Sequence, residues 1–264
     1  MKIYELGPVK FMQEYPGTAD EAFQTTGQDS FIKPIDVLKA RKNKLSGVGP
    51  LVVGVDPSRY GDDKFSIAWR QGRKVNKVES KQKVETTEAA FWIKRIIDQD
   101  DPAAVFIDSG GGGAQIYDIV VSFGEKYADV MHLINFGGEP EEPVIFLEDG
   151  SERPGPKNRR AEMWMRSNDW LKQPGGADIP DEGYLQSEAC APNYRYDIRT
   201  QHLVLESKEQ MRARKVRSPD DWDAIALTFA SMVYDDPAQR QTSSTKKSSK
   251  RPRRSKGSNS WMGR

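Results

Sequence analysis

Cysteine and histidine are nearly absent from this sequence. Cys190 is the single cysteine, and His132 and His202 are the two histidines among 264 residues. A disulfide within the chain is therefore impossible, and no Cys or His lies at the spacing of a zinc site. We interpret both histidines as structural. A chain without disulfides fits a reducing compartment, so we expect a cytoplasmic protein.

Long apolar runs and nucleotide-binding motifs are also missing. No stretch has the length of a membrane span or the layout of a signal peptide, so we expect no membrane partner. The phosphate-loop, dinucleotide-binding and nucleophile-elbow patterns do not occur. The four glycines at 110–113 therefore indicate a tight strand-to-helix turn, while close approach of a nucleic-acid backbone stays open as their second use.

Charge is balanced overall but unevenly distributed. Nine of the 40 basic residues lie within 240–264, which contains no acid, and the other 31 basic and 39 acidic residues give residues 1–239 a formal charge of −8. Such a tail indicates contact with a polyanion, although a disordered solubilising extension explains it equally well. The tail residues that we assign to DNA binding are Lys250, Arg251, Arg253 and Arg254.

The order of apolar segments predicts an α/β fold. Three strands, a helix, a strand, a helix and a further strand give a mixed five-stranded sheet flanked by helices. The strands are expected at 51–56, 64–70, 75–80, 103–108 and 130–136. We expect residues 1–50 to be a linker or adaptor, residues 51–236 to form the main domain, and residues 237–264 to be a basic disordered tail. We expect a long surface loop at 137–157, a helix at 158–172, and two short strands near 194–198 and 202–205.

Two of the expected strands end in a carboxylate. Asp56 closes the run at 51–56, and Asp108 closes the run at 103–108. Each alone is compatible with an ordinary turn residue. If the strands are neighbours, however, both carboxylates lie at one edge of the sheet, where they would repel each other unless a cation such as Mg²⁺ lies between them.

A third acidic group opens the last helix, which we expect to run from Pro219 to about Tyr234. Ser218 is expected to be its N-cap. Asp223 lies on the flank of the apolar stripe, so a partly buried carboxylate with a partner is expected there. Asp220 points to the same side and ranks second as a metal ligand. Asp221 points to the other side, where we expect only a favourable interaction with the helix dipole.

Directly before this helix, residues 208–217 are strongly basic. Their position favours phosphate contact over a merely solvated face, and the residues assigned to it are Arg212, Arg214, Lys215 and Arg217.

These features together resemble the nuclease domain of the large terminase subunit of tailed bacteriophages. The matching segments are VGVDP at 53–57 with GDD at 61–63, ID at 107–108, and SPD at 218–220 with DAIAL at 223–227. EYP at 14–16 with EAF at 21–23 is similar to the segment that joins the family's ATPase motor to its nuclease. The phosphate loop of that ATPase does not occur, which suggests a fragment, an isolated domain or a split gene product.

The resemblance implies a ribonuclease H-like fold and two-metal cleavage of concatemeric DNA during genome packaging, with Mg²⁺ or Mn²⁺ as the metal. Asp56, Asp108 and Asp223 would be catalytic metal ligands, with Asp220 and Asp62 as further acids of the site. Double-stranded DNA, the portal protein, the small terminase subunit and an ATPase motor domain would be the partners, in the host cytoplasm and transiently at the procapsid. Two alternatives stay open: another ribonuclease H-like nuclease such as a junction resolvase, and a non-catalytic module that docks on the portal.

Overall fold

A mixed five-stranded sheet divides the molecule into two layers of helices. The computed structural model describes residues 30–58, 63–146 and 150–234. The strands are ordered β3-β2-β1-β4-β5; β1 pairs antiparallel with β2 and parallel with β4, and β4 pairs parallel with β5. Their bounds are β1 Leu51–Asp56, β2 Phe65–Gln71, β3 Lys74–Lys81, β4 Ala104–Asp108 and β5 Met131–Ile134. The fold class predicted from the sequence is confirmed.

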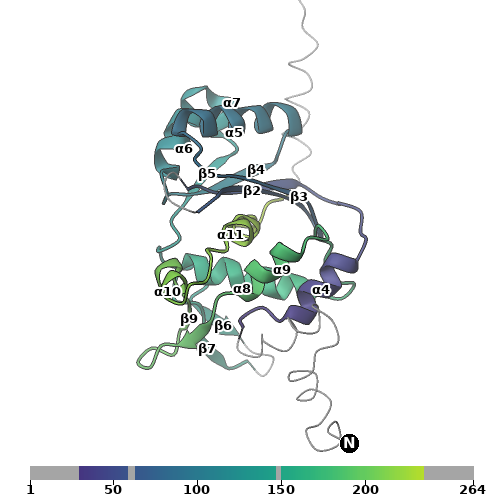
Figure 1. Cartoon of the computed structure of the whole chain (residues 1–264), viewed down its shortest axis with the longest axis vertical. Helices are drawn as coiled ribbons and strands as arrows, with labels where there is room; N and C mark the ends of the chain where they lie inside the picture. The colour runs from purple at the N-terminus through teal and green to yellow at the C-terminus, as the bar shows by residue number, and fades with distance from the viewer. Residues whose placement is uncertain (1–29, 59–62, 147–149, 235–264) are drawn as a thin grey trace, which may run out of the picture. The chain divides into compact units, whose positions relative to one another are not determined.

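Helices cover both faces of the sheet, which explains why β1 and β4 are apolar almost throughout (Figure 1). Helices α5, α6 and α7 lie on one face, and α4, α8, α9, α10 and α11 lie on the other. The bounds are α4 Pro34–Lys42, α5 Thr86–Asp100, α6 Gly113–Ser122, α7 Glu125–Ala128, α8 Arg159–Lys172, α9 Gly183–Cys190, α10 Lys208–Ala213 and α11 Asp220–Leu227.

Alternation along β1 decides which layer each side chain enters. Val53 and Val55 belong to the core beneath α5 and α6, whereas Val52 belongs to the core around α8 and α11. Because side chains alternate along a strand, Gly54 and Asp56 share the face of Val52. The same reasoning places Asp108 on the face of Phe106, which is also the α11 side. Both strand-end acids are therefore directed toward α11.

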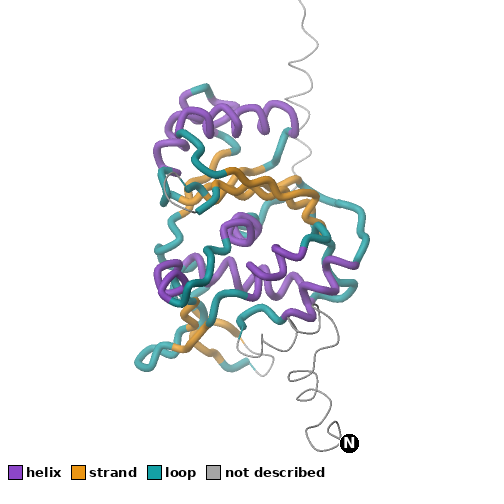
Figure 2. Tube along the Cα trace, viewed as in Figure 1, coloured by secondary structure: helices purple, strands orange, loops and turns teal. Residues whose placement is uncertain are grey.

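Helix α11 lies directly against the centre of the sheet (Figure 2). Gly54 makes this close packing possible, because a Cβ at that position would come within 2.1 Å of the backbone oxygen of Ala224. The aromatic ring of Trp222 and the side chain of Ile225 are fully buried on the other side of the helix, in the core shared with α8. Helix α11 is thus clamped between the sheet and α8.

The last helix is shorter than the sequence predicts, because α11 ends at Leu227 and not near Tyr234. Guanidinium groups from two other elements bind the carbonyl oxygens that follow it. Arg70 of β2 donates to Thr228 O at 2.7 Å, and Arg166 of α8 donates to Phe229 O at 3.1 Å and to Ala230 O at 2.9 Å. These bonds satisfy carbonyls that a continuing helix would use.

Two further differences lie in the connecting segments. The expected loop at 137–157 contains a hairpin of two short strands, β6 Val144–Phe146 and β7 Glu152–Pro154. Helix α9 was not expected, since its residues show little separation of apolar and polar faces. The expected pair of strands near 194–205 is confirmed as β8 Tyr194–Tyr196 and β9 Leu203–Leu205. Among the described residues, none of the helices combines the length and apolar character that a membrane span requires.

Candidate active site

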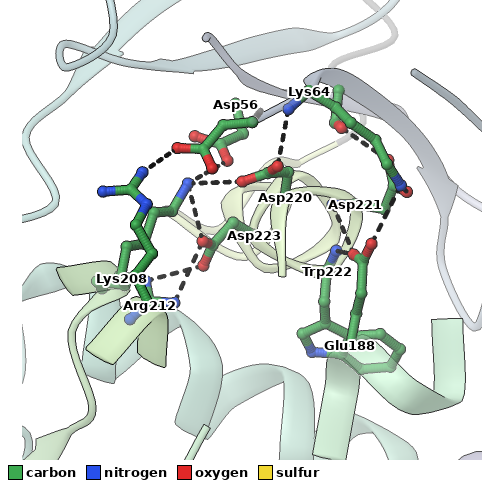
Figure 3. Close-up of polar contacts among 12 residues, drawn as sticks. Asp56, Lys64, Glu188, Lys208, Arg212, Asp220, Asp221, Trp222 and Asp223 are labelled. Carbon is green, nitrogen blue, oxygen red and sulfur yellow. Dashed lines mark hydrogen bonds and ion pairs between the residues drawn. The ribbon is translucent and has the colours of Figure 1, made fainter. Parts of the chain in front are cut away.

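The ends of β1 and β4 meet the first turn of α11 at one edge of the sheet. Val55 of β1 is aligned with Ile107 of β4 in the parallel pair, so Asp56 and Asp108 end neighbouring strands. The condition on which their proximity depends in the sequence is therefore met. The Asp56 side chain is directed toward α11, whose first turn carries Asp220 and Asp223 (Figure 3). Four carboxylates from three elements that are distant in sequence therefore gather at this edge.

The ammonium group of Lys208 lies among three of these carboxylates (Figure 3). Its Nζ is 2.8 Å from Asp56 Oδ2, 3.0 Å from Asp220 Oδ1 and 3.4 Å from Asp223 Oδ2. Burial alone would lower the pKa of Lys208, but the three carboxylates outweigh it and raise that pKa above its ordinary value. The lysine is thus held in its charged form, as the local counterion of the cluster.

Asp223 is the most deeply placed of the four, with no exposed surface. Its Oδ1 accepts hydrogen bonds from Arg160 Nε at 2.9 Å and from Trp164 Nε1 at 2.6 Å, and its Oδ2 accepts from Arg160 Nη2 at 3.2 Å. Burial would raise the pKa of Asp223, but Arg160 and Lys208 outweigh burial and lower it. Asp223 is therefore ionised and fixed in position. The sequence predicts a partly buried carboxylate here; the side chain is in fact completely buried.

Asp56 and Asp108 have the opposite electrostatic bias. Burial raises the pKa of Asp56 well above its ordinary value, and the neighbouring charges of Asp223 and Asp220 raise it further, against the opposing effect of Lys208. Burial also raises the pKa of Asp108, although the backbone N–H of Phe136 donates to its Oδ1 at 3.1 Å. The available donors therefore do not outweigh the cost of burying these two carboxylates as anions.

A count of charges tests whether the donors suit a divalent cation. If all four carboxylates ionise around a bound cation, they carry four negative charges, and Lys208 and Arg160 supply only two positive charges. Carboxylate oxygens are also the ligands that Mg²⁺ and Mn²⁺ prefer. As the side chains stand, however, no three Asp, Glu, His or Cys side chains within the described part of the chain are arranged to hold a metal ion. The oxygen donors are of the type that such a cation prefers, and the Lys208 ammonium lies among them.

This group of acids opens onto a cleft of about 830 Å³. Its lining includes the acids Asp56, Asp63 and Asp108 and also Arg160, Lys208 and Glu209. Asp220 and Asp223 are buried and do not line it. Of the four gathered carboxylates, those of Asp56 and Asp108 are therefore the ones that a ligand in the cleft can contact.

The glycine turn between β4 and α6 forms part of the cleft wall. Gly111 has a φ of +57°, and a Cβ there would come within 2.1 Å of the backbone oxygen of Pro57. A Cβ at Gly113 would come within 1.8 Å of the backbone oxygen of Asp108. Glycine is thus required for the turn to pack against β1 and β4, which favours the packing explanation. Gly111 and Gly112 nevertheless border the cleft.

The basic residues predicted for DNA binding divide into three groups. Arg212 and Arg214 are exposed but paired with acids, Arg212 with Asp63 and Arg214 with Glu206. Lys215 and Arg217 are exposed. The four tail residues Lys250, Arg251, Arg253 and Arg254 lie outside the described residues. The predicted accessory acid Asp62 lies outside them as well.

Asp221 differs from its expected role as a simple first-turn acid. Its side chain points away from Lys208, as predicted, but it is fully buried and not solvated. Its Oδ1 accepts from Ser66 Oγ at 2.6 Å, and its Oδ2 pairs with Lys64 Nζ at 2.7 Å. Asp221 therefore contributes to the stability of the fold through these two contacts as well as through the helix dipole.

The predicted N-cap is wrong. The N-cap of α11 is Pro219, which offers no side-chain cap, and the buried hydroxyl oxygen of Ser218 has no hydrogen-bond partner in the described structure. The carboxylate of Glu188, from α9, accepts instead from the backbone N–H groups of Asp221 at 2.8 Å and Trp222 at 3.2 Å.

The sequence gives little indication that several residues belong to this site. Lys208 lies in the basic stretch, and nothing in the sequence distinguishes it from its basic neighbours. Arg160 and Trp164 are four residues apart on α8, a spacing that brings both onto one face, and an arginine on the apolar face of a helix is a usable signal for a buried acidic partner. Glu188 and Lys64 show no pattern that distinguishes them.

Comparison with solved structures identifies this fold. The nuclease domain of the large terminase subunit gp2 of bacterial virus Sf6 matches with a TM-score of 0.61 and 18% identity, over 74% of this chain and 95% of that one. A mutant of that domain with manganese and beta-thujaplicinol matches with a TM-score of 0.62 and 17% identity, over 73% and 95% of the two chains. A mutant with calcium gives 0.61 and 18%, over 73% and 96%. No protein-family model matches the sequence, and no curated protein matches it either. The chain thus has the ribonuclease H-like fold of terminase nuclease domains.

Proposed function

We propose that this chain is a divalent-metal-dependent DNA endonuclease that hydrolyses phosphodiester bonds. The observation that carries this proposal is the gathering of four carboxylates at the edge of an open cleft, where three of them share the single ammonium group of Lys208. Mg²⁺ or Mn²⁺ is the proposed cofactor, in a two-metal site, because an all-oxygen donor set suits these ions. The two-metal structure of the site is carried over from the resemblance to terminase nucleases.

In this proposal Asp56, Asp108 and Asp223 are the catalytic metal ligands and Asp220 is a further ligand. Movement of the Lys208 ammonium would free three oxygens together: Asp56 Oδ2, Asp220 Oδ1 and Asp223 Oδ2. Arg160 and Trp164 would keep Asp223 ionised and oriented throughout. Bound divalent cations would activate water and stabilise the charge on the scissile phosphate. Asp62 is proposed as an accessory acid near the second cation.

Contact with the DNA backbone is proposed for the basic residues that follow Lys208 and Glu209, which line the cleft. Lys215 and Arg217 are exposed, and Arg212 and Arg214 would exchange their acidic partners for phosphates. Lys250, Arg251, Arg253 and Arg254 would add contacts that depend on salt but not on sequence. We therefore expect double-stranded DNA as substrate, with weak sequence preference.

The biological setting is proposed from the resemblance to terminases. The cut would release unit genomes from concatemeric viral DNA during packaging, in the host cytoplasm and at the procapsid. An ATPase motor domain, the portal protein and the small terminase subunit would then be the protein partners.

A plasmid-nicking assay tests the activity. We expect the purified chain to nick supercoiled DNA with Mg²⁺ or Mn²⁺ and to be inactive with EDTA. A parallel panel of linear duplex and branched substrates distinguishes the alternatives, because a junction resolvase would prefer branched DNA. Absence of cleavage with every metal, in a chain that melts cooperatively, would contradict the proposal and favour a docking module.

A further inference from the structure

Glu188 caps α11 from a different helix. One oxygen of its carboxyl group accepts hydrogen bonds from two backbone N–H groups that have no partner within the helix. No side chain within α11 or its N-cap residue does this. The contact joins two elements that lie 33 residues apart. The first turn of α11 is therefore fixed from outside the helix.

Lys64 completes this arrangement at the opening of β2. Its Nζ lies 3.2 Å from Glu188 Oε1 and 2.7 Å from Asp221 Oδ2, and its backbone N–H donates to Asp220 Oδ2 at 2.8 Å. One residue thus holds Asp221 by its side chain and Asp220 by its backbone. Figure 3 shows Lys64, Glu188 and Asp221 on the side of α11 that faces away from Lys208.

Helix α9, which carries Glu188, is itself anchored. The buried guanidinium of Arg41 on α4 donates from Nη1 to Gln186 Oε1 at 2.6 Å, and its Nε donates to Asp181 Oδ1 at 3.0 Å. Leu185 and Ala189 are fully buried on the inner face of α9. Glu188 is therefore presented to α11 by a helix that has little freedom to shift.

We propose that Glu188 is a positioning residue for the metal-site carboxylates: it fixes the first turn of α11 so that Asp220 and Asp223 face Asp56. The metal-binding role of these carboxylates rests on the proposed function, but the effect of Glu188 on the placement of α11 is testable without it. Neither the composition of α9 nor its distance from Asp56 in the sequence suggests such a role.

The experiment compares Glu188→Ala, Glu188→Gln and a matched control, Glu182→Gln, in the full chain. Glu182 is an exposed residue on the same segment whose side chain caps nothing. Amide hydrogen exchange is measured on the metal-free protein, and Mn²⁺ binding is measured by calorimetry at a temperature where every variant is folded. Thermal melts establish that temperature.

For Glu188→Ala we expect the amides of Asp221 and Trp222 to exchange about tenfold faster, because each loses its hydrogen-bond acceptor. We expect Mn²⁺ affinity to fall by roughly 10–100-fold, the usual effect of removing a group that orients metal ligands. Glu188→Gln keeps an oxygen acceptor and should recover both values to within about threefold of the wild type. Glu182→Gln should match the wild type.

A merely structural role would lower the melting temperature of Glu188→Ala without changing Mn²⁺ affinity in the folded variant, and that result would overturn the proposal. Unchanged exchange of the Asp221 and Trp222 amides would overturn it as well. If Glu188→Ala does not fold, Glu188→Asp replaces it, since the shorter side chain keeps the carboxyl group but cannot reach the N–H groups of α11. A wild-type chain that binds no Mn²⁺ refutes the proposed function, while the exchange experiment still decides whether Glu188 places α11.

Discussion

The two sides of α11 each hold a lysine between carboxylates, yet they differ in what surrounds the charges. On one side Lys208 contacts Asp56, Asp220 and Asp223 at the edge of an open cleft. On the other side Lys64 contacts Asp221 and Glu188, and the side chains that line the cleft do not include any of these three. The same pair of residue types therefore forms a candidate reaction site in one place and a structural contact in the other.

Access separates the two clusters more clearly than charge compensation does. Burial and neighbouring carboxylates raise the pKa of Asp56 and also that of Glu188, although Ser66 and two backbone N–H groups donate to the acids of the Lys64 cluster. Asp56, Asp108 and Lys208 line the cleft, whereas Lys64, Asp221 and Glu188 do not. A group of charges is thus informative about function only where a ligand can reach it.

The largest effect is expected from Asp56→Asn, on the cleft side. Nicking should fall by more than about 100-fold, because even groups that only orient a metal ligand contribute 10–100-fold. The free energy of unfolding should change by less than about 1 kcal/mol, since burial already disfavours the charged form of Asp56. Nicking rates with Mn²⁺ and urea denaturation measure the two quantities. Full activity in this variant would falsify the assignment of Asp56.

Asp223→Asn should damage both activity and stability. Removal of this charge leaves Arg160 buried with a weaker partner, and breaking a buried ion pair in this way costs about 3–5 kcal/mol. Urea denaturation checks the stability, and nicking at a temperature where the variant is folded checks the activity. A variant as stable as the wild type would mean that Arg160 finds another acceptor and that Asp223 is not the anchor of the cluster.

Asp221→Asn should separate the two sides of α11 most clearly. It weakens the ion pair with Lys64, so the free energy of unfolding should fall by about 1–3 kcal/mol. Nicking by the folded variant should stay within about threefold of the wild type, because the backbone N–H that Glu188 binds is retained. The same two assays apply. A large loss of cleavage here, beside an active Asp56→Asn variant, would reverse the roles given to the two clusters.

The smallest effect is a dependence of stability on pH that comes from Glu188. Burial, reinforced by the charge of Asp221 and opposed by Lys64, raises the pKa of Glu188 from its ordinary 4.5 to about 8. Tyr184, whose pKa is raised to about 12, stays neutral in this range. The folded state therefore keeps a proton that the unfolded state has lost. The contribution of Glu188 is fully present below pH 4.5 and is lost as the pH rises to about 8.

Between these limits the Glu188 contribution to the free energy of unfolding should decrease by at most about 1.4 kcal/mol per pH unit. Glu188→Gln cannot titrate, so its stability curve should lack this decrease. Urea denaturation of both proteins from pH 5 to pH 8 makes the comparison. Parallel curves for the two proteins would show that Glu188 is ionised throughout the range.

The sequence predicts the fold well because the fold depends on local patterns. The apolar runs that end at Asp56 and Asp108 identify two parallel strands of the sheet, and alternation then gives the face of each carboxylate. The length of the last helix was not predictable in this way. Phe229 and Val233 continue its apolar periodicity, but the arginines that end the helix come from β2 and α8, which are distant in sequence.

The residues that contact the four acids and α11 could not be identified from the sequence for the same reason. Lys208 lies in a stretch with four similar basic residues, and only the tertiary contact with Asp56 distinguishes it. Glu188 lies on a helix of weak amphipathic character, so neither its burial nor its contact with α11 could be inferred. Local patterns therefore identified the acids, whereas the partners that hold them depend on contacts between distant elements. The assignment of the acids as metal ligands stays a prediction.

The close contact between Gly54 and Ala224 fixes the distance between β1 and α11. Two main chains are in contact there, and main chains cannot repack as side chains can, so this distance can change very little. Asp56 lies two residues beyond Gly54, and Asp223 lies one residue before Ala224. A single methyl group at position 54 would wedge the strand and the helix apart and separate carboxylates that it never touches. The distance between Asp56 and Asp223 therefore depends on the absence of a side chain at Gly54.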